Sequence, residues 1–174
     1  MIWMVIRNGL IGLVIPLIVC CGFQLRSQVH FSPEFKVIYV QQQVRNGSGN
    51  FYRSVLCRKL ESLIASSGDI AVTDNPSQAI AIINIMSEDS GRRTIAVNNS
   101  DVKREYALVY SAVYEVQLTS GKILIAAESI SANRALLFDE NQVLGFENAQ
   151  ESMIESMAED LAWQIIRRLQ DIKP

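Results

Sequence analysis

The sequence is poor in the residues from which metal centres and catalytic dyads are built. Its 174 residues include one histidine, His30, and three cysteines. We find in them no set of imidazole and thiolate ligands for a closed four-ligand zinc site. His30 has no serine, aspartate or cysteine context of the kind that activates a nucleophile. No phosphate-cradling glycine motif occurs either, so the sequence predicts no metal, no cofactor and no enzymatic activity.

An excess of charge of one sign is also lacking. There are 16 Lys and Arg against 18 Asp and Glu, a formal net charge of -2, which argues against nucleic acid as a partner. Only 9 glycines are present, which excludes a collagen-like chain. Beyond the N-terminus, no apolar run approaches the roughly 20 residues that cross a bilayer. The remaining class is a single globular domain.

Residues 1–20 read as a signal peptide. They contain one base, Arg7, and no acid, and an apolar core follows Asn8, which is the order of a secretory signal. The alternative is a permanent membrane anchor. It would place Arg7 and Asn8 in hydrocarbon, at a cost of about 2.5 to 3.5 kcal/mol for the arginine. We therefore expect cleavage rather than anchoring by this segment.

The end of the apolar core resembles the lipobox of bacterial lipoproteins. Two adjacent thiols, Cys20 and Cys21, follow Val19. Lipidation requires a thiol that a diacylglyceryl group can alkylate, and the residue before that thiol must be small. Cys21 meets this requirement better than Cys20, because Cys21 is preceded by the small Cys20, whereas Cys20 is preceded by the β-branched Val19. We assign Cys21, with Cys20 as the alternative; two ordinary thiols after a secretory signal are the other interpretation. The residue after the lipidated cysteine is Gly22 rather than the Asp that is associated with retention of lipoproteins in the inner membrane, which points to the outer membrane.

The rest of the chain divides into a lipidated tether, residues 21–34, and one domain, residues 35–174. Alternation and helical spacing of apolar residues predict its elements. The predicted helix from Asn50 to Gly68 contains Cys57, which we interpret as a small core residue. The expected elements are strands at residues 35–40, 70–73, 79–86, 106–118 and 123–135, and helices at 51–67 and 148–169.

The clearest pattern is a long hairpin. From Tyr106, even positions through Leu118 form one face, and Thr119–Lys122 supplies the turn. We expect an α+β sandwich with two helices packed on one face of a largely antiparallel sheet of four to five strands.

The chain resembles the LptE family of lipopolysaccharide-assembly lipoproteins. Mature members begin with a lipidated Cys, a Gly, an aromatic residue and a Leu-Arg pair, as Cys21–Arg26 does. The similarity continues in Glu105-Tyr106, Arg134 and the terminal Arg167–Leu169. It implies a non-enzymatic, lipid-anchored protein on the periplasmic side of the outer membrane. Its partner would be the β-barrel LptD, whose assembly it would support while helping to deliver lipopolysaccharide to the outer leaflet.

The resemblance also implies lipid contacts through bases in loops near the hairpin. The predicted loop, Thr94–Ser100, contains no base, but Arg92, Arg93, Lys103 and Arg104 flank it. Guanidinium groups bind phosphate oxygens bidentately, so we name Arg92 and Arg93 as the main candidates for contact with the phosphates of lipid A. The alternative is that these bases only solvate a turn.

Two other functions stay open at this point. A membrane-tethered periplasmic hydrolase would need a catalytic carboxylate pair. Asp139 and Glu140, which adjoin a predicted loop, are a candidate pair, but adjacent acids usually mark a solvated turn. A general lipid-binding lipoprotein of the envelope, without a barrel partner, is the other alternative.

Overall fold

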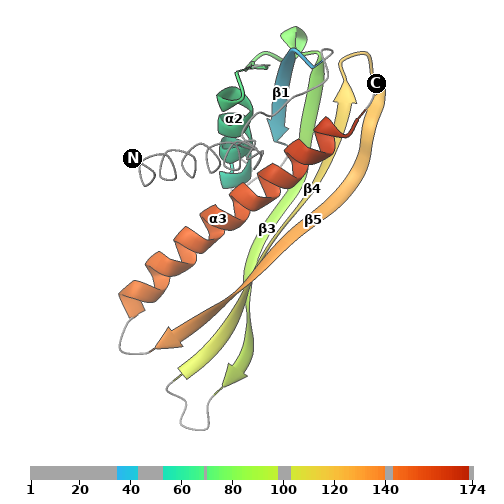
Figure 1. Cartoon of the computed structure of the whole chain (residues 1–174). Coiled ribbons are helices and arrows are strands. Elements are labelled where there is room, and N and C mark those ends of the chain that lie inside the picture. Colours follow the sequence, from blue (N-terminus) through green and yellow to red (C-terminus); the bar gives the residue numbers. More distant parts are fainter. Residues whose placement is uncertain (1–34, 43–52, 69, 98–102, 140–142, 173–174) are drawn as a thin grey trace, which may run out of the picture.

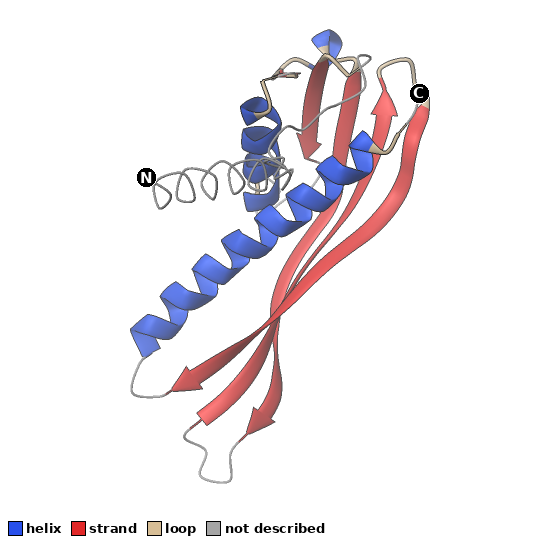
Figure 2. Cartoon of the chain, viewed as in Figure 1, coloured by secondary structure: helices blue, strands red, loops and turns tan. Residues whose placement is uncertain are grey.

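The computed structural model describes residues 35–42, 53–68, 70–97, 103–139 and 143–172. They form one five-stranded sheet in the order β2-β1-β3-β4-β5 and two α-helices, which lie on the same face of the sheet (Figures 1 and 2). The elements are β1 (Val37–Gln42), α2 (Val55–Ser66), β2 (Ala71–Val72), a 3-10 turn at Pro76–Gln78, β3 (Ala81–Val97), β4 (Lys103–Leu118), β5 (Ile123–Asp139) and α3 (Val143–Gln170). The predicted α+β sandwich is confirmed.

The sheet is mixed. β1 runs parallel to both β2 and β3, whereas β3, β4 and β5 are antiparallel to one another. β1 and β2 are parallel because α2 carries the chain from the end of β1 back to the end of the sheet at which β1 begins, as the crossover between parallel strands must. The turn between β4 and β5 closes with the Gly121 N–H donating to the Leu118 carbonyl at 2.8 Å, and Gly121 has a φ of 87°, which favours glycine.

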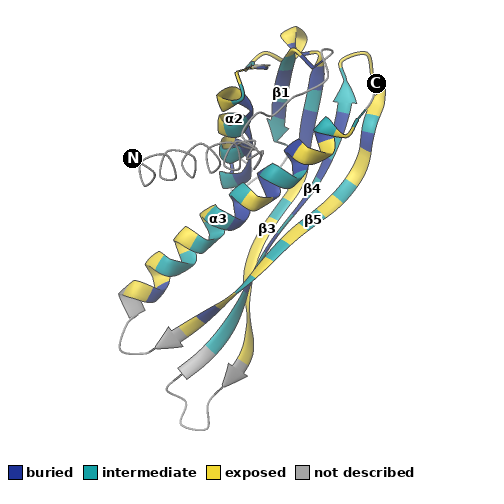
Figure 3. Cartoon of the chain, in the orientation of Figure 1, coloured by how far each residue is buried: buried dark blue, intermediate teal, exposed yellow. Residues whose placement is uncertain are grey.

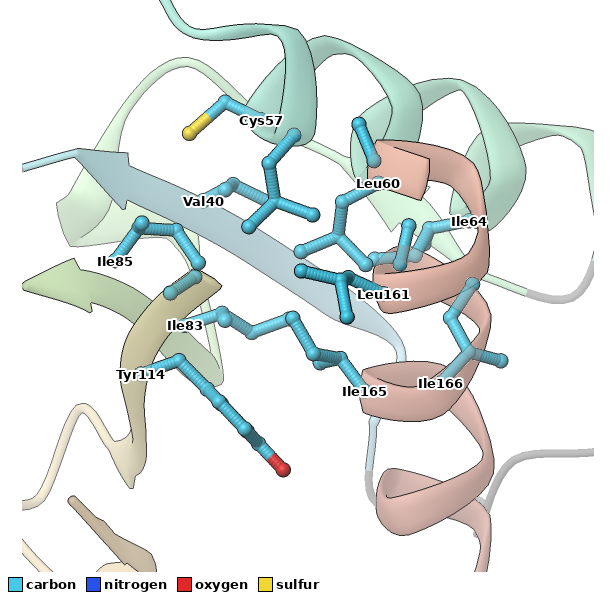
Figure 4. Close-up of a cluster of buried hydrophobic side chains, with 14 of the residues drawn as sticks. Val40, Cys57, Leu60, Ile64, Ile83, Ile85, Tyr114, Leu161, Ile165 and Ile166 are labelled. Atoms are coloured by element: carbon cyan, nitrogen blue, oxygen red, sulfur yellow. The ribbon is translucent and has the colours of Figure 1, made fainter. Parts of the chain in front are cut away.

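The hydrophobic core lies where both helices cover the sheet (Figures 3 and 4). The even positions of β4, from Leu108 to Val116, are buried, as the alternation predicted. The core is completed by apolar side chains of β1, β3, α2 and α3, among them Val40, Ile83, Ile85, Leu56, Leu60, Ile64, Leu161, Ile165 and Ile166. Lys59 of α2 also lies 3.6 Å from Glu159 of α3.

The three long strands continue beyond β1, whose last paired residue, Gln42, lies opposite Ile85. We call the continuation the extension; it comprises residues 87–97, 103–113 and 129–139, which remain paired across the sheet. α3 lies along it and α2 does not (Figure 1). No helix in the described ranges is both long and apolar enough to cross a membrane.

A β-bulge at Met86 separates the core part of β3 from the extension. Ile85 pairs with Tyr114, but Ser87 pairs with Val113, so one extra residue reverses the alternation of β3. Odd positions up to Ile85 face the helices, whereas even positions face them from Glu88 to Thr94, between the two register shifts. Through this shift the polar side chains of Glu88, Ser90 and Arg92 lie on the helix side.

The helices begin elsewhere than predicted. The N-cap of α2 is Ser54, whose Oγ accepts a hydrogen bond from the Cys57 N–H at 3.1 Å; the predicted cap, Asn50, lies outside the described residues. α3 starts at Val143, earlier than the predicted Asn148. Gly145 and Asn148 lower helix propensity in this stretch, which is why sequence pattern placed the start too late.

Candidate lipid-contact site

The extension presents one candidate base together with two aromatic rings. The Arg92 guanidinium carbon lies 5.4 Å from the ring centroid of Tyr106 and 6.0 Å from that of Phe146. The two rings are 5.7 Å apart and tilted by 58°. β3, β4 and α3 each contribute one residue, so the cluster forms only when all three elements are in place.

Register explains why these residues meet. Thr94 pairs with Tyr106 and Arg92 with Leu108, so the Arg92 and Tyr106 side chains share the helix-facing side. Phe146 is buried in the first turns of α3, where it packs against that side. Since cation–π attraction acts through the flat face of a guanidinium, the donors in its plane stay available to an anion.

Arg93 lies on the other side of the sheet. It pairs with Ala107, and neighbours along a strand point to opposite faces. Both arginines are exposed. The structure therefore does not bring Arg92 and Arg93 together, and one phosphate group cannot be chelated by both.

The predicted loop was placed wrongly. β3 continues to Val97, so Arg92 and Arg93 lie within a strand rather than beside a loop that starts at Thr94. A second register shift, at Ile95, allows β3 to stay paired with β4 up to Val97, although apolar and polar residues do not alternate regularly there. Alternation is weak in this stretch because it is polar on both faces.

The other candidate bases open β4. Lys103 pairs with Asp139, and Arg104 pairs with Val97 and Phe138; the placement of their side chains lies outside the described structure. Cys20 and Cys21 also lie outside the described residues. Arg134 of β5 binds Asp160 of α3 at 2.6 Å and so joins the extension to the helix.

Tyr106 and Phe146 are the residues that sequence reasoning missed at this site. The sequence places Tyr106 at the start of the predicted hairpin strand and, beside Glu105, in the family resemblance, but not in a site. Phe146 was assigned to no element, because the helix was expected to start after it. An earlier helix start would have been the signal, but the contact of Phe146 with Arg92 depends on how α3 packs on β3.

A separate polar cluster lies beside the first turn of α2. Tyr110 donates a hydrogen bond to Glu88 Oε1, while Glu88 Oε2 is buried without a hydrogen-bond partner. Burial, and after it this hydrogen bond, raises the pKa of Tyr110 above its usual range. Burial also raises the pKa of the neighbouring Cys57 thiol to about 11. Both shifts favour the uncharged forms, as expected for groups that support packing.

The Cys57 shift predicts a pH dependence of stability. Its pKa is raised from 9.0 to about 11 in the folded chain, so the folded state holds the proton more tightly than the unfolded state. The contribution is complete below pH 9 and is lost as the pH rises towards 11. Urea unfolding across this range should show a loss of up to about 2 to 3 kcal/mol from this thiol. A Cys57→Ala variant is the control, and pH profiles of equal slope in the two chains would contradict the prediction.

In the part of the chain that the structure describes, no group of three or more His, Cys, Asp or Glu side chains is arranged to hold a metal ion. What the site offers is a guanidinium that lies over two neighbouring aromatic rings at the edge of a narrow sheet. This arrangement suits binding of an anionic group that also carries apolar surface.

Solved structures share this fold. Uncharacterized lipoprotein B from Nitrosomonas europaea is 24% identical, with a TM-score of 0.66 over 86% of this chain and 90% of its own. Rare lipoprotein B from Shewanella oneidensis is 15% identical, with a TM-score of 0.60 over 77% and 93%. A minor lipoprotein from Acinetobacter baumannii is 17% identical, with a TM-score of 0.56 over 78% and 91%. At these identities the likeness establishes the fold alone.

Sequence comparison establishes the family. No curated protein sequence matches the chain, but the family model of LptE, described as lipopolysaccharide-assembly, matches residues 35–169. The match runs from two residues before β1 to the last turn of α3 and so includes both helices, the sheet and the extension. The chain belongs to the LptE family of lipopolysaccharide-assembly proteins.

Proposed function

We propose that this protein is an outer-membrane lipoprotein that supports assembly of an LptD-type β-barrel and helps to deliver lipopolysaccharide to the outer leaflet. The family match over residues 35–169 is the observation that carries the proposal. A lipid on Cys21 would hold the chain at the membrane, and the domain would act from the periplasmic side. Binding and handing over a lipid needs no bond to be made or broken, so the role is non-enzymatic and uses no cofactor.

The extension is the part of the domain best suited to meet the lipid. It is narrow, it projects beyond β1 and α2 (Figure 1), and it carries Arg92 above two aromatic rings. Lipid A combines phosphates with acyl chains, and charge-assisted hydrogen bonds from a guanidinium are its natural recognition. Lys103 and Arg104 would add charge at the same end of the sheet, and Arg93 would add charge on the opposite face from Arg92.

Replacing Arg92 and Arg93 by alanine should weaken lipopolysaccharide binding. Hydrogen bonds to a charged group contribute about 1.5 to 3 kcal/mol, so the loss is about tenfold or more in Kd. Binding to purified lipopolysaccharide, measured at fixed salt, is the test. We expect the Arg92→Ala single variant to account for most of the loss, because its guanidinium is the one held in place.

Arg167→Ala is the matched control for that experiment, since Arg167 is an exposed arginine in the last turn of α3. It removes one charge away from the extension. Unchanged lipopolysaccharide binding by the double variant, or an equal loss in Arg167→Ala, would remove both arginines from the proposed site.

Co-purification tests the barrel partnership. The chain is extracted from its native membrane in mild detergent through an affinity tag, and the bound proteins are identified. The proposal expects an outer-membrane β-barrel in near-equal amount. Recovery of the chain without any such barrel would reject the partnership and favour a lipid-binding lipoprotein that works alone.

A further inference from the structure

The two faces of the sheet differ in what covers them. Both helices lie on one face (Figures 1 and 2), and no element of the described ranges lies on the other, which we call the open face. It comprises the odd positions of β4 and the residues that pair with them in β3 and β5, because the even positions of β4 are buried beneath the helices. A sheet face without a covering layer normally carries polar side chains.

The open face instead carries the large apolar side chains that remain exposed in the described part of the chain. Ile123 pairs with Gln117 and Leu137 pairs with Glu105, so both lie on the open face. Ile80 immediately precedes the first residue of β3, which is fully buried on the helix side, and therefore points the other way. The exposed large apolar residues are Ile80, Met86, Ile95, Ile123 and Leu137.

The two bulges of β3 place the remaining two of these side chains on the same face. Met86 follows Ile85, and Ile95 follows Thr94; in each pair the first residue faces the helices. Since neighbours along a strand point to opposite faces, Met86 and Ile95 point away from the helices. Scattered exposed apolar residues are normal on a soluble domain, but their restriction to one face indicates an interaction surface.

Between these side chains the open face is flat, because its other residues are small or β-branched. β4 contributes Ala107, Val109, Ser111 and Val113, β5 contributes Ser129, Ser131, Asn133 and Ala135, and β3 contributes Gly91. A face of this kind allows another sheet to approach to about 10 Å, the distance at which two stacked sheets pack.

The charges on the open face argue against an anionic lipid as its occupant. Among the side chains that the structure describes, Asp89, Glu105 and Glu115 are acidic and Arg93 is basic. Acids in excess would repel phosphate groups, whereas mixed charges among apolar and hydroxyl groups are typical of a surface that binds protein. The opposite side of the molecule is less suited to binding, because the outer surface of α3 is a run of exposed acids, Glu147, Glu151 and Glu155.

The open face is also large enough for a specific protein interface. From the spacing of strands and the rise per residue, the extension alone measures about 14 Å by 36 Å, and the core part brings the footprint to roughly 900 Å². A stable interface takes about 800 Å² from each partner. A single partner that covered this face would therefore meet the usual size.

We propose that the open face is the surface through which this protein binds the wall of its β-barrel partner, an inference that rests on the proposed function. A barrel wall is itself a twisted sheet, so the two surfaces can pack as stacked sheets do. Side chains that barrel strands present to the lumen are polar; the hydroxyl and amide groups of the open face bind them while its apolar side chains exclude water. Arg92, on the helix side, stays accessible to lipid.

Photo-crosslinking of the full-length chain in its native membrane tests which face meets the barrel. A benzophenone side chain is introduced at Ser131 of the open face and, as the matched control, at Ser152 of α3; both serines are exposed. We expect the yield of crosslinks to the barrel to be about tenfold or more higher from position 131, since only a side chain at the interface lies close enough to react.

Charge substitution provides a second measurement. Ser129→Glu with Ser131→Glu should lower the amount of barrel that co-purifies by about tenfold or more, because two carboxylates would be buried without partners. Ser62→Glu with Ser152→Glu adds the same charge to exposed positions of α2 and α3 and should leave recovery unchanged. Circular dichroism reports that each variant is folded.

Other results overturn the inference. Full recovery of the barrel by the open-face variant, or crosslinks of equal yield from positions 131 and 152, means that the barrel binds elsewhere, while the partnership itself stands. Crosslinks from position 131 to a second copy of the chain, or to lipopolysaccharide alone, identify a different occupant. If the unsubstituted chain recovers no barrel, the proposed function fails, and the open face loses this partner with it.

Discussion

Replacing Cys21 by alanine is expected to release the mature chain completely from the membrane. A lipoprotein cysteine carries two ester-linked acyl chains and usually a third on its amine. Each buried CH₂ contributes about 0.8 kcal/mol, so one chain binds only marginally, whereas two or more chains together give stable anchoring. In the proposed function this lipid is what attaches the domain to the membrane. Fractionation into membrane and soluble pools, with mass spectrometry of the mature N-terminus, measures the effect.

Cys20→Ala is the matched control for that variant. It changes the adjacent thiol and leaves a small residue before Cys21, so attachment should be retained. If Cys20→Ala releases the chain and Cys21→Ala does not, the modified residue is Cys20. If both variants stay in the membrane pool, neither thiol carries the anchor, and the proposed position at the outer membrane loses its basis.

Much of the fold could be predicted because its strongest patterns are local. The even positions of β4 are buried in the structure, and the turn at Thr119–Lys122 joins β4 to β5 as expected. α3 buries Met157, Leu161 and Ile165 along one stripe. In both elements a repeating period extends over more than ten residues, so that a few irregular positions do not hide it.

Features that depend on pairing between distant segments could not be read in the same way. The bulge at Met86 moves Arg92 to the helix side, and a single extra residue in a polar stretch leaves no periodic signal. Parallel pairing of β1 with β3 depends on the path of α2. Arg92 and Arg93 looked like one site because they are adjacent, yet alternation along a strand separates them.

Replacing Leu161 by alanine should strongly lower the free energy of unfolding of the domain. The Leu161 side chain is fully buried and points from α3 into the cluster that contains Leu60 and Ile83 (Figure 4). Truncation of such a leucine costs about 2 to 5 kcal/mol, because lost transfer energy is joined by the cost of a cavity. Urea unfolding followed by circular dichroism should show a lower midpoint and an unchanged slope.

Leu137→Ala is the matched control, since Leu137 is a leucine of β5 that is 61% exposed. Its truncation should change stability by about 0.5 kcal/mol or less. Equal losses in the two variants would contradict the assignment of the core to the seam between the helices and the sheet. We expect lipopolysaccharide binding by Leu161→Ala to fall only in proportion to the fraction of unfolded molecules. α3 also brings Phe146 to Arg92. A larger fall in binding would therefore show that loosening α3 disturbs the arginine site before the domain unfolds.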